Sequence, residues 1–203
     1  KCLEARGVSI VAYTMKAAGI SCSVIRENEI EENPMRAPDN EAAKVMVKRM
    51  EELMAAGESA GGLVECRIRG VKAGLGDPVF EKLDACIARA VLSIGAVKGI
   101  EFGAGFSAAD MTGSEHNRLG ANHAGGILAG ISTGEDIVFR LAVKPTPSVS
   151  VPQAAVDARG NPSVITIEGR HDPVICPRIV PVVEAMACLV LEDNYKLQAA
   201  LLA

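Results

Sequence analysis

The chain has 203 residues, 49% of them apolar, and a formal net charge of −4, which is the composition of a globular protein with a sizeable core. Aromatic residues make up only 3% and tryptophan is absent. The sequence has no block of lysine and arginine, and few aromatic side chains are available to stack on bases, so we expect no nucleic-acid partner. No apolar run reaches the length that spans a bilayer, so we expect no membrane partner either.

The first half of the chain contains strand and helix patterns in turn. Val8–Met15 is rich in β-branched residues and predicts a strand, which Gly19–Ile25 could extend. The apolar residues of Glu41–Ala56 mostly keep helical spacing, and Gly57 is a typical helix stop. Leu63–Arg69 then alternates apolar and polar residues, which predicts a strand with one buried face.

The second half shows similar patterns. We expect a helix over Val79–Leu92, strands over Lys98–Phe102, Asp136–Val143 and Val164–Glu168, and a long helix over Pro177–Leu191. The last helix is apolar nearly all round, so it is buried either in the core or at a subunit contact. Together these elements predict an α+β fold in which antiparallel sheets have long apolar helices packed between or against them.

We expect one domain over residues 1–203. A weak internal echo (Gly-Gly, strand, loop, Asp-Pro, apolar helix) suggests two similar sheet-plus-helix units, at about residues 57–95 and 122–191. Lys1–Arg6 resembles the end of a helix, and a domain rarely begins halfway through a helix, so we also expect missing residues upstream of Lys1.

The six cysteines form no C-x-x-C pair, and the three histidines have no metal-ligand spacing. These patterns argue against a metal site. Several cysteines lie in apolar runs and no signal peptide is visible, which favours a reducing, cytoplasmic compartment.

The segment Gly169–Pro173 has two interpretations. Asp172 precedes a proline at the start of a helical pattern, which is typical of a helix N-cap, and Asp77–Pro78 has the same pattern without any sign of chemistry. Arg170 and His171 support the alternative. A cation, an imidazole and a carboxylate together at a helix N-terminus suit an anionic ligand and proton transfer.

The segment Lys144–Pro145–Thr146–Pro147–Ser148 follows a predicted strand. It offers one positive charge and two hydroxyls, and its prolines stiffen the loop that carries them. This combination suits a phosphate or a polar heterocycle. A rigid strand exit with an exposed lysine fits the composition equally well.

Two stretches of small residues, Gly95–Ala96 and Gly120–Gly134, would let a ligand ring approach the backbone, but their glycines do not fit a dinucleotide fingerprint. His123 within the second stretch is more typical of a structural residue than of a catalyst. Gly57–Gly61 resembles a G-x-S-x-G nucleophile elbow. However, a helix precedes Ser59 and a strand follows it, which is the reverse of what the elbow requires.

Five blocks, taken together and in order, resemble the chorismate synthase family: Gly57–Arg67, Gly74–Leu83, Ala96–Phe106, Asn122–Ser148 and Gly169–Leu189. The resemblance covers nearly all of this chain and a little over half of the family's chain, its C-terminal part. The family's opening Gly-x-Ser-His-Gly motif, its second catalytic histidine, its Arg-Ser-Ser flavin loop and several substrate-binding arginines do not occur in this sequence.

The resemblance implies a β-α-β sandwich, a homotetramer and a lyase of the shikimate pathway. Such an enzyme converts 5-enolpyruvylshikimate 3-phosphate to chorismate and phosphate with reduced FMN, and bifunctional members use NADPH as reductant. On matching positions the resemblance implies Asp172 as the catalytic acid/base. It implies FMN contacts at Gly95, Ala96, Ala129, Lys144, Pro145, Thr146, Pro147, Ser148 and Arg170. Ala129 stands where the family usually has glycine.

The first hypothesis is therefore a chorismate synthase, or a large piece of one that is inactive by itself. The alternative is a non-catalytic remnant or split subunit that acts as an assembly or binding partner. A third reading is another flavin- or phosphate-binding enzyme that shares only the fold.

Overall fold

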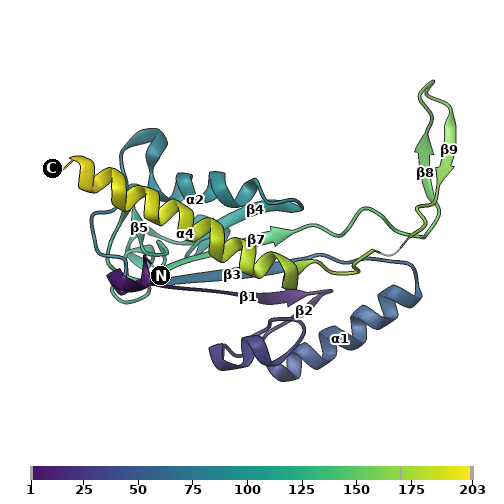
Figure 1. Ribbon diagram of the computed structural model, residues 1–203, viewed down its shortest axis with the longest axis horizontal. Helices are drawn as coiled ribbons and strands as arrows, with labels where there is room; N and C mark the ends of the chain where they lie inside the picture. Colours follow the sequence, from purple (N-terminus) through teal and green to yellow (C-terminus); the bar gives the residue numbers. More distant parts are fainter. Residues whose placement is uncertain (1, 170, 202–203) are drawn as a thin grey trace. The chain divides into compact units, whose positions relative to one another are not determined.

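The computed structural model describes residues 2–169 and 171–201 (Figure 1). The α-helices are α1 (Asn40–Ala55), α2 (Leu83–Leu92), α3 (Gly113–His116) and α4 (Cys176–Leu201). Short 3₁₀ helices are η1 (Glu4–Arg6), η2 (Glu27–Glu32), η3 (Val79–Glu81) and η4 (Gly105–Asp110). The strands are β1 (Ser9–Ala17), β2 (Ile20–Ser21), β3 (Gly62–Arg69), β4 (Val97–Phe102), β5 (Ile127–Leu128), β6 (Ile131–Ser132), β7 (Ile137–Val143), β8 (Gln153–Val156) and β9 (Pro162–Ile165).

The strands form one large sheet and two small ones. The large sheet has the order β2-β1-β3-β7-β4, and β5-β6 and β8-β9 are two-stranded sheets. β1 pairs antiparallel with β2, β5 with β6, and β8 with β9. Together with the long helices, this arrangement confirms the predicted α+β fold.

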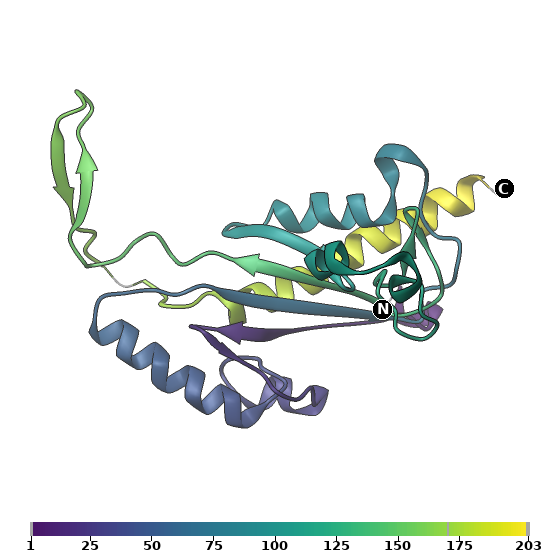
Figure 2. The same ribbon diagram turned by 180° about the vertical axis from the view of Figure 1, so that it is seen from behind.

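The chain divides into two compact units, each described by itself. The first unit comprises Lys1–Tyr13, Val64–Ala142 and Arg178–Ala203. In it, α2 packs against β4, and Figure 2 shows the strands in front of α4. The core is mostly aliphatic: Ile68, Leu141, Ile87 and Leu191 are fully buried, and so are the aromatic residues Phe139 and Tyr13.

A buried polar network lies on the strands of the first unit. The carboxylate of Glu65 on β3, which is only 5% exposed, accepts hydrogen bonds from the Tyr13 hydroxyl at 2.5 Å and from Nε of Arg67 at 3.0 Å. Nε of Arg140 on β7 lies 3.6 Å from the other carboxylate oxygen. Two arginines therefore compensate the charge of a carboxylate that burial would otherwise make costly.

The second unit comprises Thr14–Leu63 and Val143–Pro177. Its main helix is α1, which begins after the N-cap Asp39, whose side chain accepts hydrogen bonds from the backbone N–H groups of Glu41 and Ala42. Met46 and Leu53 on α1 are buried, and Gly57, with a left-handed φ of 69°, follows the end of the helix as predicted.

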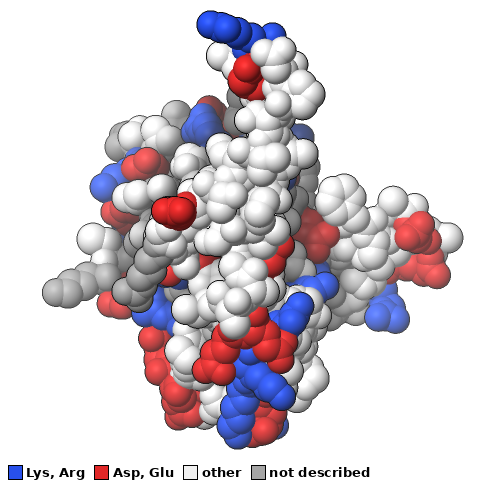
Figure 3. All heavy atoms as spheres, turned by 90° about the vertical axis from the view of Figure 1, so that its right-hand side faces the viewer, with Lys and Arg blue, Asp and Glu red and all other residues white. Residues whose placement is uncertain are grey.

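The β8–β9 hairpin is a protruding part of the second unit. Both strands are exposed apart from Ala155, and the register places Ala154 opposite Val164 and Val156 opposite Pro162, so one face of the hairpin is apolar. Figure 3 shows charged side chains gathered at its tip (top of the view) and few along its length. The predicted strand Val164–Glu168 is in the structure Pro162–Ile165, paired with a strand that the sequence analysis did not predict.

The structure corrects the prediction that Asp172 caps the last helix. α4 begins at Cys176, four positions beyond Asp172, and the segment between them is not helical. Asp77 is likewise not the cap of α2, because Pro78 precedes the short η3 and α2 begins only after Lys82. The Asp-Pro pattern is a local signal, and at both places the helix begins several residues after it.

Candidate active site

The polar loop Lys144–Ser148 leaves the end of β7 in the second unit. Its residues have no regular secondary structure, Pro145 and Pro147 are exposed, and Lys144, Thr146 and Ser148 are half-buried. The prolines lock the backbone φ angle at two of the five positions. The loop therefore carries one amine and two hydroxyl groups on a backbone that two prolines stiffen.

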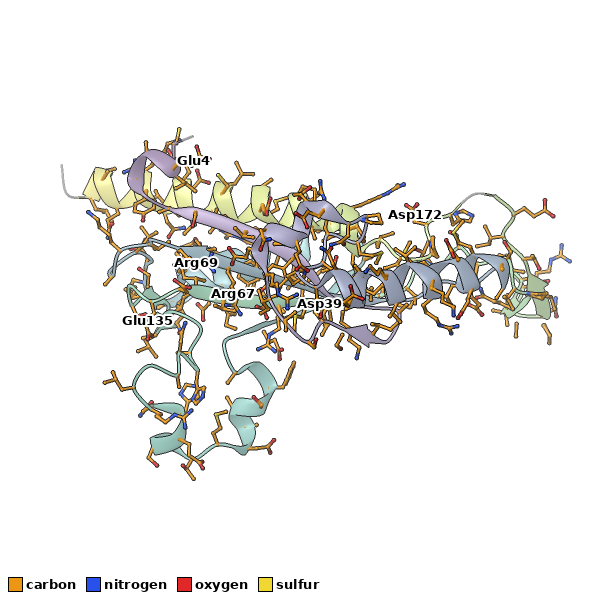
Figure 4. The ribbon with its side chains drawn as sticks, turned by 90° about the horizontal axis from the view of Figure 1, so that it is seen from below. Glu4, Asp39, Arg67, Arg69, Glu135 and Asp172 are labelled. Carbon is orange, nitrogen blue, oxygen red and sulfur yellow. The ribbon has the colours of Figure 1, made fainter. Side chains whose placement is uncertain are left out.

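Asp172 lies in the segment that leads into α4, where Figure 4 labels it. The Thr146 hydroxyl donates a hydrogen bond to the backbone carbonyl of Asp172 at 3.0 Å. Asp172 itself is half-buried. The structure thus brings together the two segments that sequence analysis singled out separately.

A third segment, Gly57–Gly62, joins the other two. The N–H of Ser150 donates to the carbonyl of Gly57 at 2.9 Å, and the N–H of Ala60 donates to the carbonyl of Pro173 at 2.8 Å. The Ser59 hydroxyl donates to the carbonyl of Thr146 at 2.6 Å. Three stretches that are far apart in the sequence are therefore held together by main-chain groups and two hydroxyls.

A cavity of about 160 Å³ lies at the junction of the three segments. Its lining residues are Met54, Gly57, Glu58, Ser59, Ser148, Ser150, Gly169, His171, Asp172 and Pro173. The lining combines hydroxyls, one imidazole and two carboxylates. Such a set suits hydrogen bonding and proton transfer more than the binding of a dianion by itself, since two carboxylates repel an anion.

The size of the cavity limits what the second unit can hold. Sites that enclose a whole small-molecule ligand measure about 300–1,000 Å³, so a cavity of about 160 Å³ admits a small polar group or one edge of a larger ligand. Its polar lining suits hydrogen bonding to such a group. Lys144, on the adjoining loop, carries the positive charge of the Lys144–Ser148 segment. It is the residue of this loop that could pair with a phosphate group.

The other predicted flavin contacts lie in the first unit. Gly95 and Ala96 form the turn between α2 and β4, and Ala129 lies in the turn between β5 and β6. Ala96 and Ala129 both have left-handed φ angles, 71° and 52°, a region that glycine adopts without strain. Arg170 lies outside the residues that the structure describes.

The two-residue turn at Ala129 has a definite geometry. Leu128 pairs with Ile131, and the intervening Ala129 and Gly130 have φ angles of 52° and 87°. A type I′ turn requires positive φ at both central residues, which is why Asn-Gly and Gly-Gly are preferred there. The glycine that the family usually has at this position therefore matches the demands of the turn itself.

Several other chemical groups do not form a site. Nδ1 of His123 lies 3.1 Å from the carbonyl of Glu115, in keeping with the structural role predicted for it. Within residues 2–169 and 171–201, no cluster of three or more His, Cys, Asp or Glu could hold a metal ion. All six cysteines are free, and burial raises the pKa of the Cys176 thiol to about 12, so this thiol stays protonated at neutral pH.

No helix in the described part of the chain is both long enough and apolar enough to cross a membrane.

The family model for chorismate synthase matches residues 1–195. The chain belongs to the chorismate synthase family. It is 55% identical over 199 residues to the chorismate synthase of Syntrophobacter fumaroxidans and 51% identical over 203 residues to that of Roseiflexus castenholzii. Each match covers 95% of this chain and 57% of the relative. The chain therefore spans little more than half the length of these chorismate synthases.

A solved chorismate synthase structure superimposes on this chain with a TM-score of 0.76 at 27% sequence identity, covering 95% of this chain and 58% of the other. The fold expected from the resemblance to chorismate synthase is thereby confirmed. The assignment of individual site residues stays a prediction, as does the division into repeated units at 57–95 and 122–191.

The part that Gly57–Gly62 plays in assembling the site was not predicted from the sequence. There, Ser59 was weighed only as a nucleophile, and that role was rejected. The glycines of this segment were a usable signal, because glycine lets another backbone segment approach closely. The structure shows such an approach: a Cβ atom on Gly61 would lie 2.4 Å from the carbonyl oxygen of Val143.

Proposed function

We propose that this chain is the portion of a chorismate synthase that carries the proton-transfer residue Asp172 and the Lys144–Ser148 loop. In the complete enzyme it takes part in converting 5-enolpyruvylshikimate 3-phosphate to chorismate and phosphate. Membership of the family supports the reaction. The observation that supports the site is the junction of the two segments through Thr146 and Asp172.

The reaction removes one proton from C6 of the substrate ring and breaks the C–O bond to phosphate, so it has no net change in redox state. Bound reduced FMN would supply electron density to the reacting ring and a basic N5 nitrogen. Asp172 would hold the proton that is exchanged with N5, which its place in the cavity lining supports. Lys144 would balance phosphate charge, and Thr146 and Ser148 would orient the flavin edge.

The roles of Gly95, Ala96, Ala129 and Arg170 in holding FMN belong to the same proposal. So do NADPH as reductant and assembly into a homotetramer, which rest on the family alone.

A reconstitution experiment tests the proposal. The enzyme used is this chain mixed with, or fused to, the remaining portion of the Syntrophobacter fumaroxidans relative, here called the reconstituted enzyme. We expect it to form chorismate from the phosphate ester with reduced FMN, whereas the chain by itself shows no measurable turnover. Turnover by the chain by itself would contradict the second expectation. A folded but inactive reconstituted enzyme would instead favour a non-catalytic remnant.

The variant Asp172→Asn tests the role of the carboxylate. We expect the reconstituted enzyme to lose about 100-fold or more in kcat, the range typical of a missing general acid or base. The fold should persist, because Asp172 does not cap α4. The control is Asp157→Asn at the tip of the hairpin, which keeps an Asx-turn residue there and should leave kcat unchanged. Equal turnover in both variants would remove Asp172 from the mechanism.

A further inference from the structure

The Gly57–Gly62 segment has the composition that a close three-way junction needs. On one side, a Cβ atom on Gly61 would lie 2.4 Å from the carbonyl oxygen of Val143, at the exit of β7. A Cβ atom on Gly57, whose φ is 69°, would lie 3.1 Å from Cβ of Ser150. The segment therefore lies against the residues that flank the polar loop on both sides, and Gly61 leaves no room there for a larger side chain.

Within this run of small residues, Ser59 is the side chain that carries a hydroxyl, and its hydrogen bond is specific. Oγ of Ser59 donates to the carbonyl of Thr146 at 2.6 Å. The hydroxyl of Thr146 in turn donates to the carbonyl of Asp172 at 3.0 Å. Next to Ser59, the N–H of Ala60 donates to the carbonyl of Pro173 at 2.8 Å.

These bonds hold both the loop at Thr146 and the segment at Asp172 in place, starting from Ser59 and Ala60. Ser59 orients the peptide of Thr146, and the side chain of Thr146 orients the backbone of Asp172. All of these bonds are partly buried, where the loss of one partner leaves a carbonyl without compensation. The hydroxyl hydrogen of Ser59 is used in holding the loop, which agrees with its rejection as a nucleophile.

We infer that Ser59 is a positioning residue of the proposed active site, which sets the placement of Asp172 through Thr146. The inference rests on the proposed function of Asp172. Geometry has a large effect on proton transfer, since displacement of a reacting group by about 1 Å can lower a rate about 100-fold. Ser59 therefore acts on kcat through the placement of Asp172.

The test compares Ser59→Ala, Ser59→Thr and Ser93→Ala in the reconstituted enzyme. Ser93→Ala is the matched control, because Oγ of Ser93 donates to the carbonyl of Ala90 at the same 2.6 Å but lies at the end of α2 in the first unit. We expect Ser59→Ala to lower kcat about tenfold or more, with KM within about twofold. Ser93→Ala should leave both unchanged, and Ser59→Thr should restore most of kcat.

A second measurement needs no activity. Amide hydrogen exchange of the 203-residue chain should show faster exchange at the N–H of Ala60 in Ser59→Ala, and unchanged exchange there in Ser93→Ala. Wild-type kcat in Ser59→Ala, or wild-type exchange at Ala60, would overturn the inference. A fall in activity that only matches a smaller folded fraction would also overturn it. If the wild-type reconstituted enzyme is inactive, the proposed function fails. Amide exchange at Ala60 then still shows whether Ser59 holds the junction of the three segments together.

Discussion

The Thr146 hydroxyl donates a hydrogen bond to the backbone carbonyl of Asp172 at 3.0 Å, and this bond joins the loop after β7 to the segment before α4. A hydrogen bond of this kind between partly buried groups contributes about 1 kcal/mol to stability. Asp172 is thus placed by a tertiary contact of its main chain.

Replacing Thr146 by valine keeps the shape of the side chain and removes the donor. We expect Thr146→Val to lower the free energy of unfolding of the 203-residue chain by about 1 kcal/mol, since the carbonyl of Asp172 loses its partner. Urea denaturation measures the change. Thr146→Ser keeps the hydroxyl and should retain most of the stability; a valine variant as stable as wild type would show that the bond contributes nothing.

Ala129 occupies a left-handed position with φ of 52° in an exposed turn. We expect Ala129→Gly to stabilise the chain by about 0.5–1 kcal/mol. The left-handed conformation costs an L-residue about 1–2 kcal/mol, which glycine avoids. Part of this gain is lost, because glycine has more conformational entropy in the unfolded chain. The control is Ala85→Gly on the exposed side of α2, which should destabilise by about 1 kcal/mol. Thermal unfolding distinguishes the two signs, and destabilisation by Ala129→Gly would contradict the argument.

Asp39 links stability to pH. Hydrogen bonds from the N–H of Ala42 and from Ser23 hold the pKa of Asp39 at about 2, below its ordinary value of 3.8. Because the folded-state pKa is the lower one, the stabilisation is fully present above about pH 4. It is lost as the pH falls towards 2.

We therefore expect Asp39→Asn to weaken the pH dependence of stability between about pH 4 and pH 2. Asparagine is also an acceptable N-cap, so the helix should remain. Urea midpoints measured across this pH range for wild type and variant provide the check. An identical slope in both proteins would mean that other groups produce the acid dependence.

Tyr13 donates its hydroxyl to Glu65 in the first unit. Burial, followed by this hydrogen bond to Glu65, raises the pKa of Tyr13 well above its ordinary value, so the phenol stays a donor at every working pH. We expect Tyr13→Phe to cost about 1–3 kcal/mol, the usual range for a lost hydrogen bond to a buried charged group. Tyr195→Phe keeps the ring that Arg6 covers at 4.9 Å and should change stability by less than about 0.5 kcal/mol. Denaturation of both variants gives the comparison.

Sequence patterns predicted those elements whose signals are local. The alternation of Leu63–Arg69 gave β3 nearly to the residue, and Gly57 marked the C-terminal end of α1. In both cases the deciding residues lie within the element or next to it. The β8 strand was missed because Gln153–Val156 is short and lacks alternation, although the Asp157–Asn161 stretch contains typical turn residues.

The error at Asp172 has a different physical origin. The residues after it are suitable for a helix start, but the carbonyl of Pro173 accepts a hydrogen bond from the N–H of Ala60, a residue that is remote in sequence. Likewise, the hydrogen bond from Ser59 to the carbonyl of Thr146 joins residues that are far apart in the sequence and meet only in the folded chain. Residue types therefore indicated the chemistry of the site, whereas the contacts that assemble it could be found only in three dimensions.

The exposed tip of the β8–β9 hairpin gives experimental access to this assembly. Arg159 lies in that tip, within a turn that Asp157 closes with hydrogen bonds from the N–H groups of Arg159 and Asn161, and such tips are preferred sites for proteases. Cleavage by trypsin after Arg159 would place the Lys144–Ser148 loop and Asp172 on separate polypeptides. Co-elution of the two pieces under native conditions would then report how firmly they associate without a covalent connection.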